Sequence, residues 1–218
     1  MMNTKHHAIS QKQLQKLHNQ AVAIKRQNDS LYSDLSTRQM AIAQCAADLL
    51  ENGDIVFINS SSTALMVYSC IQGKSLVIVT NNCNALALPN NPCVELILTG
   101  GEMIGNKQAL VGELAMNPLT KITASKCILG TNGISAMAGI SSNKIQETAV
   151  NRLMLKKCNG PKILVADGSK IGHEDNFAYA EINDITHLIT DLTADDEELA
   201  KIRRAGVAVT IVDPANSH

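Results

Sequence analysis

The sequence is poor in aromatic residues and carries almost no net charge. Its 218 residues include no Trp, three Tyr and two Phe, so we expect no base-stacking platform for single-stranded nucleic acid. The formal net charge is -1 at pH 7, and a neutral chain does not attract nucleic-acid phosphates over its whole surface. Strong DNA binding by this chain alone is therefore not expected.

Membrane, metal and cofactor signals are also missing. No run of 18 apolar residues occurs, and the first 13 residues lack the apolar stretch of a secretory signal, so a cytoplasmic protein without a membrane span is expected. The six cysteines form no C-x-x-C pair, which argues against a metal site, and Cys70 and Cys127 lie in apolar runs typical of buried thiols. The motifs G-x-G-x-x-G and G-x-x-x-x-G-K-[ST] are absent, so no cofactor is expected.

Short apolar runs alternate with helical patterns along most of the chain. The runs are typical of strands buried on both faces of a sheet, and they lie at 54–59, 76–80, 94–99, 126–130, 162–167, 187–190 and 207–212. Periodicity and capping signals predict helices at about 62–71, 82–88, 144–158 and 195–205, and an earlier helix that opens at the capping box Ser36–Gln39 and ends at Gly53. This alternation predicts an α/β fold with a mostly parallel sheet flanked by helices.

The composition changes near the start of the chain. Residues 1–28 contain five Lys or Arg residues and no acidic residue, and apolar positions at heptad spacing predict a short amphipathic helix. We interpret residues 1–35 as a basic helical extension or linker, residues 36–213 as the main domain and residues 214–218 as a tail. The basic helix is either a solvated connector or a segment that docks on a partner or on DNA.

Small polar residues follow five of the predicted strands. In parallel α/β sheets ligands bind beyond the carboxyl ends of the strands, and the residues found there are Asn59–Thr63, Thr80–Asn82, Thr99–Glu102, Gly130–Gly133 and Asp167–Lys170. The serines at 60–62 could cap the following helix, or they could cradle an anion at its N-terminus. Lys170 could contact a phosphate or remain a solvated surface charge.

The order of these loops resembles the C-terminal effector-sensing domain of the DeoR family of bacterial transcriptional repressors. The resemblance covers about 36–213 and includes Thr80-Asn81, Gly100-Gly101, the Gly130–Ile134 segment with Gly139, Asp167–Lys170 and Thr190-Asp191. It implies a fold similar to ribose-5-phosphate isomerase and glucosamine-6-phosphate deaminase. It also implies a phosphorylated sugar or related metabolite as the effector, and homo-oligomers.

The resemblance also implies which residues bind the effector. Ser60, Ser61, Ser62 and Thr63 would hold the phosphate, and Asn81, Gly100 and Gly101 would line the sugar. Asp167 and Lys170 would close the site, with Glu147 as a further candidate. The remaining positions assigned to ligand binding from these loops are Asn59, Gly130, Asn132 and Ser169.

The sequence departs from the family pattern in two respects. Asn59 stands in place of the usual Asp, Ser61 and Ser62 in place of Gly and Thr, and Ile104 in place of an Arg. Only 35 residues precede the matched region, which leaves no room for the family's helix-turn-helix domain. We therefore expect contact with DNA only through a helix-turn-helix domain that this sequence lacks.

Two other functions compete with a sensor. A sugar-phosphate isomerase or deaminase could use Glu102, Glu147, Asp167 or Lys170 for proton transfer, but the resembling isomerases carry paired carboxylates where this chain reads Leu129–Ile134, without an acid. The other alternative is a degenerate sensor that has lost its ligand and acts through protein association. The sequence favours the sensor, with no catalytic residue and no metal.

Overall fold

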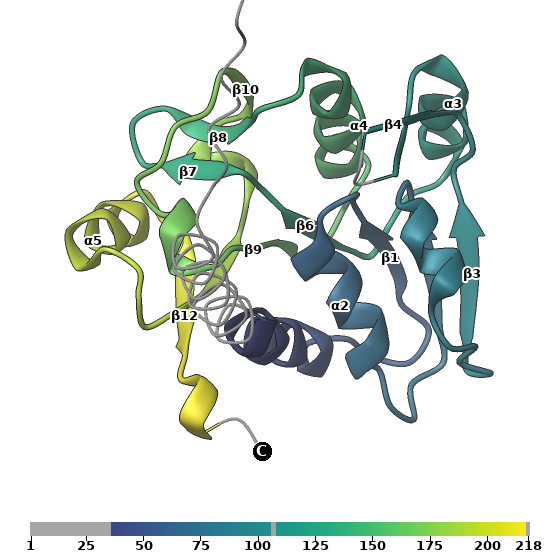
Figure 1. Ribbon diagram of the computed structural model, residues 1–218, viewed down its shortest axis with the longest axis horizontal. Coiled ribbons are helices and arrows are strands. Elements are labelled where there is room, and N and C mark those ends of the chain that lie inside the picture. Colours follow the sequence, from purple (N-terminus) through teal and green to yellow (C-terminus); the bar gives the residue numbers. More distant parts are fainter. Residues whose placement is uncertain (1–35, 106–107, 217–218) are drawn as a thin grey trace, which may run out of the picture. The chain divides into compact units, whose positions relative to one another are not determined.

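The computed structural model describes residues 36–105 and 108–216 (Figure 1). A seven-stranded, entirely parallel sheet forms the centre, in the order β12-β11-β9-β6-β1-β2-β3. Each of the seven predicted apolar runs becomes one of these strands: β1 (Ile55–Ile58), β2 (Leu76–Thr80), β3 (Val94–Leu98), β6 (Lys126–Gly130), β9 (Lys162–Val165), β11 (His187–Asp191) and β12 (Ala208–Val212). The predicted fold class is confirmed.

Helices cover both faces of the sheet. Alternate residues of each strand point to opposite faces, so Val56 and Ile58 pack with the helix over residues 36–48 and with α2 (Ser62–Cys70). Phe57 belongs to the core on the other face, which includes residues of α3 (Glu113–Lys121), α4 (Ile145–Lys156) and α5 (Asp196–Arg204). The predicted burial of Cys70 and Cys127 is confirmed.

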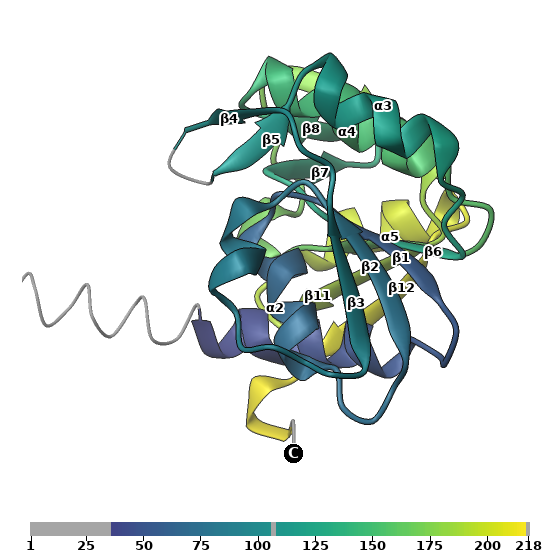
Figure 2. The same ribbon diagram turned by 90° about the vertical axis from the view of Figure 1, so that its right-hand side faces the viewer.

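Small antiparallel elements accompany the parallel sheet. One sheet has the order β10-β8-β7, formed by Phe177–Ala180, Gly139–Ser142 and Gly133–Ser135. A second pairs β4 (Glu102–Ile104) with β5 (Ala109–Val111). Figure 2 shows both gathered with α3 and α4 at one end of the central sheet. β7 begins three residues after β6 ends, so this layer lies next to the carboxyl ends of the strands.

Some predicted elements differ from the observed ones. The segment predicted as a helix at 82–88 is a 3-10 helix, η1 (Cys83–Ala87), which is capped by Asn82 and followed by Pro89. The first described helix ends at residue 48 instead of Gly53.

The basic segment 1–35 lies outside the described residues, and the division of the chain at 35 and 213 stays a prediction. Pro214–Asn216, in the predicted tail, forms a 3-10 turn. Among the described residues, no helix has both the length and the apolar character needed to cross a membrane.

Candidate functional site

The predicted site residues lie at the carboxyl ends of adjacent parallel strands. Asn59–Thr63 follow β1, Asn81 follows β2, Gly100 and Gly101 follow β3, Gly130 ends β6, and Asp167–Lys170 follow β9. Because β9, β6, β1, β2 and β3 are consecutive neighbours in one parallel sheet, the loops meet at one edge. The topology thus assembles the residues that the sequence analysis singled out.

Asn59 clamps two strand ends together. Its Oδ1 accepts hydrogen bonds from the Gly130 N–H at 3.0 Å and the Ser61 N–H at 3.3 Å. Its Nδ2 donates to the Gly130 carbonyl at 2.9 Å and to Asn151 Oδ1 at 3.1 Å. The side chain is buried and both of its polar atoms have partners. Asn59 therefore fixes the backbone that surrounds the site, and neither of its polar atoms is left without a partner for a ligand to bind.

The N-terminus of α2 follows Asn59 and is held to it through the Ser61 N–H. Ser61 is the N-cap residue, and its Oγ accepts from the Ala64 N–H at 3.4 Å, so the capping interpretation is correct for this serine. Its φ is -68°, so the position needs no glycine. A Cβ at Gly130 would overlap the Ser61 side chain, which explains a glycine there. The first N–H groups of α2 have no acceptor within the helix and carry its positive dipole end.

A small polar cavity of about 20 Å³ lies between the end of β6 and α4, which is room for about one water-sized group. Its walls are Asn59, Ser61, Gly130, Thr131, Asn132, Ser142, Glu147, Asn151 and Tyr179. Glu147 Oε1 and Tyr179 Oη are buried and lack hydrogen-bond partners among the described residues. Polar atoms of this kind usually have partners in folded proteins, so the cavity is prepared for a polar group.

The charges around this cavity determine whether Tyr179 and Glu147 act as hydrogen-bond donors or acceptors. Burial raises the pKa of Tyr179 and outweighs the opposite effect of the nearby Thr131 hydroxyl, and the Glu147 carboxylate contributes in the same direction as burial. The phenol therefore stays protonated and can donate. Lys144 Nζ lies 4.0 Å from Glu147 Oε1, beyond hydrogen-bond distance but close enough to stabilise the carboxylate. Glu147 can thus accept a hydrogen bond from a hydroxyl or an amine.

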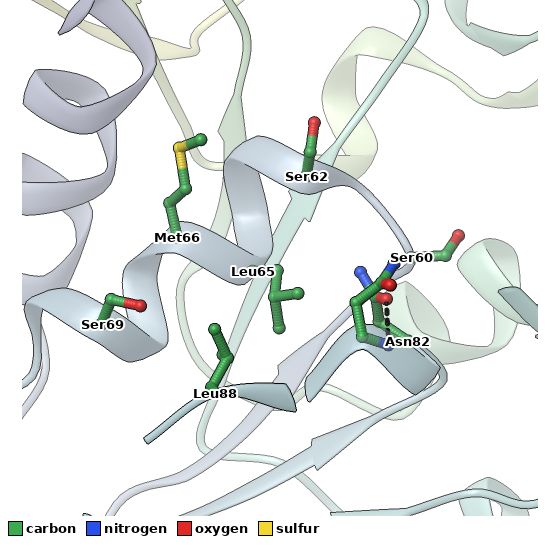
Figure 3. A pocket seen from close by; sticks show the side chains of 8 residues that line it. Ser60, Ser62, Leu65, Met66, Ser69, Asn82 and Leu88 are labelled. Carbon is green, nitrogen blue, oxygen red and sulfur yellow. Dashed lines mark hydrogen bonds between the residues drawn. The ribbon is translucent and has the colours of Figure 1, made fainter. Parts of the chain in front are cut away.

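A larger cleft of about 360 Å³ opens on the other side of the α2 N-terminus, between α2 and η1 (Figure 3). Ser60 and Ser62 line it near the strand ends, and Leu65 and Leu88 point toward one another across it, while the Ser60 hydroxyl points away from that pair. Ser60 Oγ is buried without a partner among the described residues. Of the predicted phosphate residues, Ser60 and Ser62 therefore line the larger cleft, Ser61 lines the polar cavity, and Thr63 lines neither.

The residues after β2 and β3 are committed mainly to packing. Asn81 Nδ2 donates to the Leu110 carbonyl at 2.9 Å, which holds β5 against the end of β2, while its buried Oδ1 has no partner in the described part of the chain. Gly101 has a φ of 114°, and a Cβ there would overlap the Val111 carbonyl and Ala115. Gly100 has a φ of 73° and open space around it. Neither glycine lines the two hollows described above.

The Asp167–Lys170 loop is a capped 3-10 turn, η2 (Gly168–Lys170). Asp167 is buried, and its Oδ1 accepts from the N–H and the hydroxyl of Ser169. Ser169 is exposed and Lys170 is half-buried, and within residues 36–105 and 108–216 no ion pair holds Lys170. Asp167 therefore orders the loop, and Lys170 is the group in it that remains available to an anion.

Several residues of the site were not predicted. Thr131, Ser142, Asn151 and Tyr179 line the polar cavity, and Lys144 lies beside Glu147. Asn151 faces Glu147 from the next turn of α4, a spacing of four residues that could have signalled it. Tyr179 comes from β10, and nothing in its local sequence indicates this position. No group of three His, Cys, Asp or Glu side chains suited to a metal ion occurs in the described part of the chain.

The comparison with known families decides between a sensor and an enzyme. Residues 35–192 match the DeoR C terminal sensor domain. The chain belongs to the DeoR family. The chain is 30% identical over 208 residues to the HTH-type transcriptional regulator GolR of Listeria innocua, covering 92% of this chain and 81% of that protein. It is 31% identical over 166 residues to the lactose phosphotransferase system repressor of Streptococcus mutans, covering 75% of this chain and 65% of the repressor.

The DeoR sensor domain also has distant structural neighbours. Ribose 5-phosphate isomerase A of Methanocaldococcus jannaschii matches 61% of this chain and 52% of its own with a TM-score of 0.41 and 11% identity. The delta subunit of eIF2B from Chaetomium thermophilum matches 70% of this chain and 55% of its own with a TM-score of 0.48 and 13% identity. The family match and the regulator relatives confirm the prediction of a sensor that is not an enzyme.

Proposed function

We propose that this DeoR sensor domain binds a phosphorylated sugar or a related phosphorylated metabolite at the carboxyl ends of its strands. The observation that carries the proposal is the gathering there of buried polar atoms without partners among the described residues: Ser60 Oγ, Asn81 Oδ1, Glu147 Oε1 and Tyr179 Oη. Leaving such atoms unsatisfied costs about 1–3 kcal/mol each. A ligand that satisfied them would recover this energy on binding.

The phosphate end of the ligand is assigned to the α2 N-terminus and Lys170. The N–H groups of Ser62 and Thr63 are the first of α2, where the helix dipole favours an anion. Ser60 and Ser62 supply hydroxyls beside them. Lys170 comes from the loop after β9 and carries a positive charge that no acidic side chain of the described chain neutralises.

The other end of the ligand is assigned to the polar cavity of Glu147 and Tyr179. A volume of about 20 Å³ admits one hydroxyl or amino group and excludes a whole sugar ring. The Glu147 carboxylate would accept a hydrogen bond from this group, and the Tyr179 hydroxyl would donate one to it.

Binding would act by shifting an equilibrium between two states of the regulator. A ligand changes such an equilibrium only by its difference in affinity for the two states. In a regulator with a helix-turn-helix domain, the two states would differ in DNA binding or in homo-oligomer assembly. GolR and the lactose phosphotransferase system repressor are regulators by name, which supports this role for the present chain.

A thermal shift series tests the proposal. Phosphorylated pentoses, hexoses, amino sugars and trioses are compared with their unphosphorylated counterparts at fixed protein concentration, because a ligand that binds the folded state raises Tm. We expect one phosphorylated compound to stabilise the protein and its counterpart to have little effect. Lys170→Met should reduce this stabilisation, whereas Lys121→Met, at the exposed last residue of α3, should not. Equal shifts with and without the phosphate would refute the proposed phosphate site.

A further inference from the structure

We infer that Asp191 is a positioning residue that couples the ligand loop Asp167–Lys170 to Arg38 on the first helix of the domain. The inference rests on the proposed function for the identity of the loop, and it adds a route by which binding is transmitted. Arg38 and Asp191 lie near the two ends of the matched family domain, residues 35 and 192. The coupling therefore leads from the site to the N-terminal boundary of the sensor.

The Asp191 carboxylate bonds to two loops at the end of the sheet. It ends β11 and is completely buried, with 0% of its side chain exposed. Its Oδ2 accepts from the Gly168 N–H at 3.0 Å. Its Oδ1 accepts from the Thr193 N–H at 2.8 Å and the Thr193 hydroxyl at 2.5 Å. One carboxylate thus connects the loop after β9 with the loop after β11.

Arg38 completes this arrangement from the helix over residues 36–48. Its Nη1 donates to Thr193 Oγ1 at 3.1 Å and lies 3.9 Å from Asp191 Oδ1. The Thr193 hydroxyl therefore relays the contact, since it accepts from Arg38 and donates to Asp191. A buried carboxylate needs charge compensation, and Arg38 is the cation within 4 Å of Asp191 in the described part of the chain.

The two loops also pack without free space between them. A Cβ at Gly168 would overlap Thr193 and the backbone nitrogen of Ala194. Any displacement of Gly168 must therefore move the 193–194 turn or weaken the hydrogen bond to Asp191. Gly168 lies between Asp167, which caps η2, and Lys170, the proposed phosphate contact.

These contacts define how occupation of the site reaches Arg38. An anion bound by Lys170 would draw η2 toward the α2 N-terminus and change the Gly168 hydrogen bond to Asp191. Asp191 and Thr193 would then change their interaction with Arg38, and with it the stability of the first helical turn. By linkage, the coupling free energy between the two segments is the same in both directions. A variant that loosens Arg38 must therefore also change the stability of the ligand loop.

Hydrogen exchange of the ligand-free protein tests the connection first. The variants are Arg38→Met, which keeps most of the aliphatic stem and removes the charge, and Thr193→Val, which keeps the shape and removes the hydroxyl. We expect exchange at 168–170 to become at least about fivefold faster in both variants, although neither side chain bonds to that segment. Arg203→Met changes an exposed arginine of α5 and should leave exchange at 168–170 unchanged. Thr193→Ser keeps the hydroxyl, so its exchange at 168–170 should equal that of the wild type. Unchanged exchange at 168–170 in both variants would overturn the inference.

A second arm adds ribose 5-phosphate and inorganic phosphate as probes. If a probe raises Tm, it should also change exchange in the helix over residues 36–48 of the wild type, and this response should be lost in Arg38→Met while the Tm shift persists. A Tm shift without any helix response would refute the coupling and leave the ligand site intact. If neither probe nor any other phosphorylated compound raises Tm, the proposed function fails, and the ligand-free variants alone decide whether Asp191 connects the two segments.

Discussion

The side chains of Asn59 and Asn151 are joined amide to amide, with Asn59 Nδ2 donating to Asn151 Oδ1 at 3.1 Å. This bond connects the end of β1 to α4 in the floor of the candidate site. Asn59 also makes two hydrogen bonds to Gly130 and one to the Ser61 N–H. The site is therefore built on a neutral amide whose oxygen and nitrogen are both paired.

Replacing Asn59 should destabilise the fold. Asn59→Ala leaves the Gly130 N–H and carbonyl and the Ser61 N–H without their partner, and we expect a loss of about 2–4 kcal/mol in the free energy of unfolding. Asn59→Asp keeps the two acceptor contacts but turns a carboxylate oxygen toward the Gly130 carbonyl, so it should also be less stable than the wild type at neutral pH. Urea denaturation of both variants checks this. A free energy of unfolding for Asn59→Asp at or above the wild-type value would contradict the assigned hydrogen bonds.

Glu147 should show opposite effects on stability and binding. Its Oε1 is buried and makes no hydrogen bond within the described residues, and its charge compensation is the ion pair with Lys144 Nζ at 4.0 Å. Glu147→Gln therefore replaces an unsatisfied buried carboxylate with a neutral amide. We expect a rise of about 1 kcal/mol in the free energy of unfolding, together with at least a tenfold weaker affinity for the stabilising phosphorylated compound. The exposed Glu95→Gln on β3 is the matched control, and it should change neither quantity. Equal ligand affinity in Glu147→Gln would remove Glu147 from the binding site.

Asp54 should make stability depend on pH in the acidic range. Burial alone would raise the pKa of Asp54, but hydrogen bonds from Lys126, the Glu51 N–H and Ser125 lower it below its ordinary value. A depressed pKa in the folded state stabilises the fold at pH values above the unfolded pKa of roughly 3.9. This stabilisation is lost as the pH falls through the folded pKa.

Comparison of variants isolates the contribution of Asp54. The difference in the free energy of unfolding between the wild type and Asp54→Asn should be constant near neutral pH and should shrink below about pH 4. Glu95→Gln, at an exposed position of β3, should show a much smaller change with pH. If the wild-type protein instead gained stability relative to Asp54→Asn on acidification, the pKa of Asp54 in the folded state would not be lowered.

Gly130 should not tolerate a side chain. A Cβ there would overlap Ser61 Oγ and Cβ, and Ser61 is fixed as the N-cap of α2. We expect Gly130→Ala to lower the free energy of unfolding by about 1–3 kcal/mol and to weaken ligand binding by displacing the α2 N-terminus. Gly206→Ala would be strained by its φ of 94° but has open space, so it should affect stability without affecting binding. Thermal unfolding and binding of both variants separate the two effects.

The sequence was sufficient to predict the central sheet but not the layer at its edge. Strands such as β2 and β6 are continuous apolar runs bounded by polar loops, which is a strong signal. By contrast, β7 and β8 are short and consist of Gly, Ser and Ile, without the alternation that marks a strand. The helix α3 contains Pro118 and follows Gly112 without a side-chain cap, so it lacks the start signal of a helix and carries a residue that usually ends one.

The candidate site was predictable where it follows the strands and unpredictable where distant segments approach it. Asn59 and Gly130 were found because the ends of parallel strands meet at one edge. The sequence could not show that Asn59 is already fully paired, because its partner Asn151 is 92 positions away. The position of Tyr179 beside Glu147 depends on β10 pairing with β8, a tertiary contact without a local motif.

Calorimetric titration of the wild-type protein with matched pairs of compounds tests the central claim most directly. The pairs are ribose 5-phosphate with ribose and glucosamine 6-phosphate with glucosamine, extended to whichever phosphorylated compound stabilises the protein in the thermal series. The account predicts saturable binding of at least one phosphorylated member, at least about tenfold tighter than its unphosphorylated counterpart, and loss of that preference in Lys170→Met. Saturable binding without any preference for the phosphorylated member, or the same preference in Lys170→Met, would contradict it.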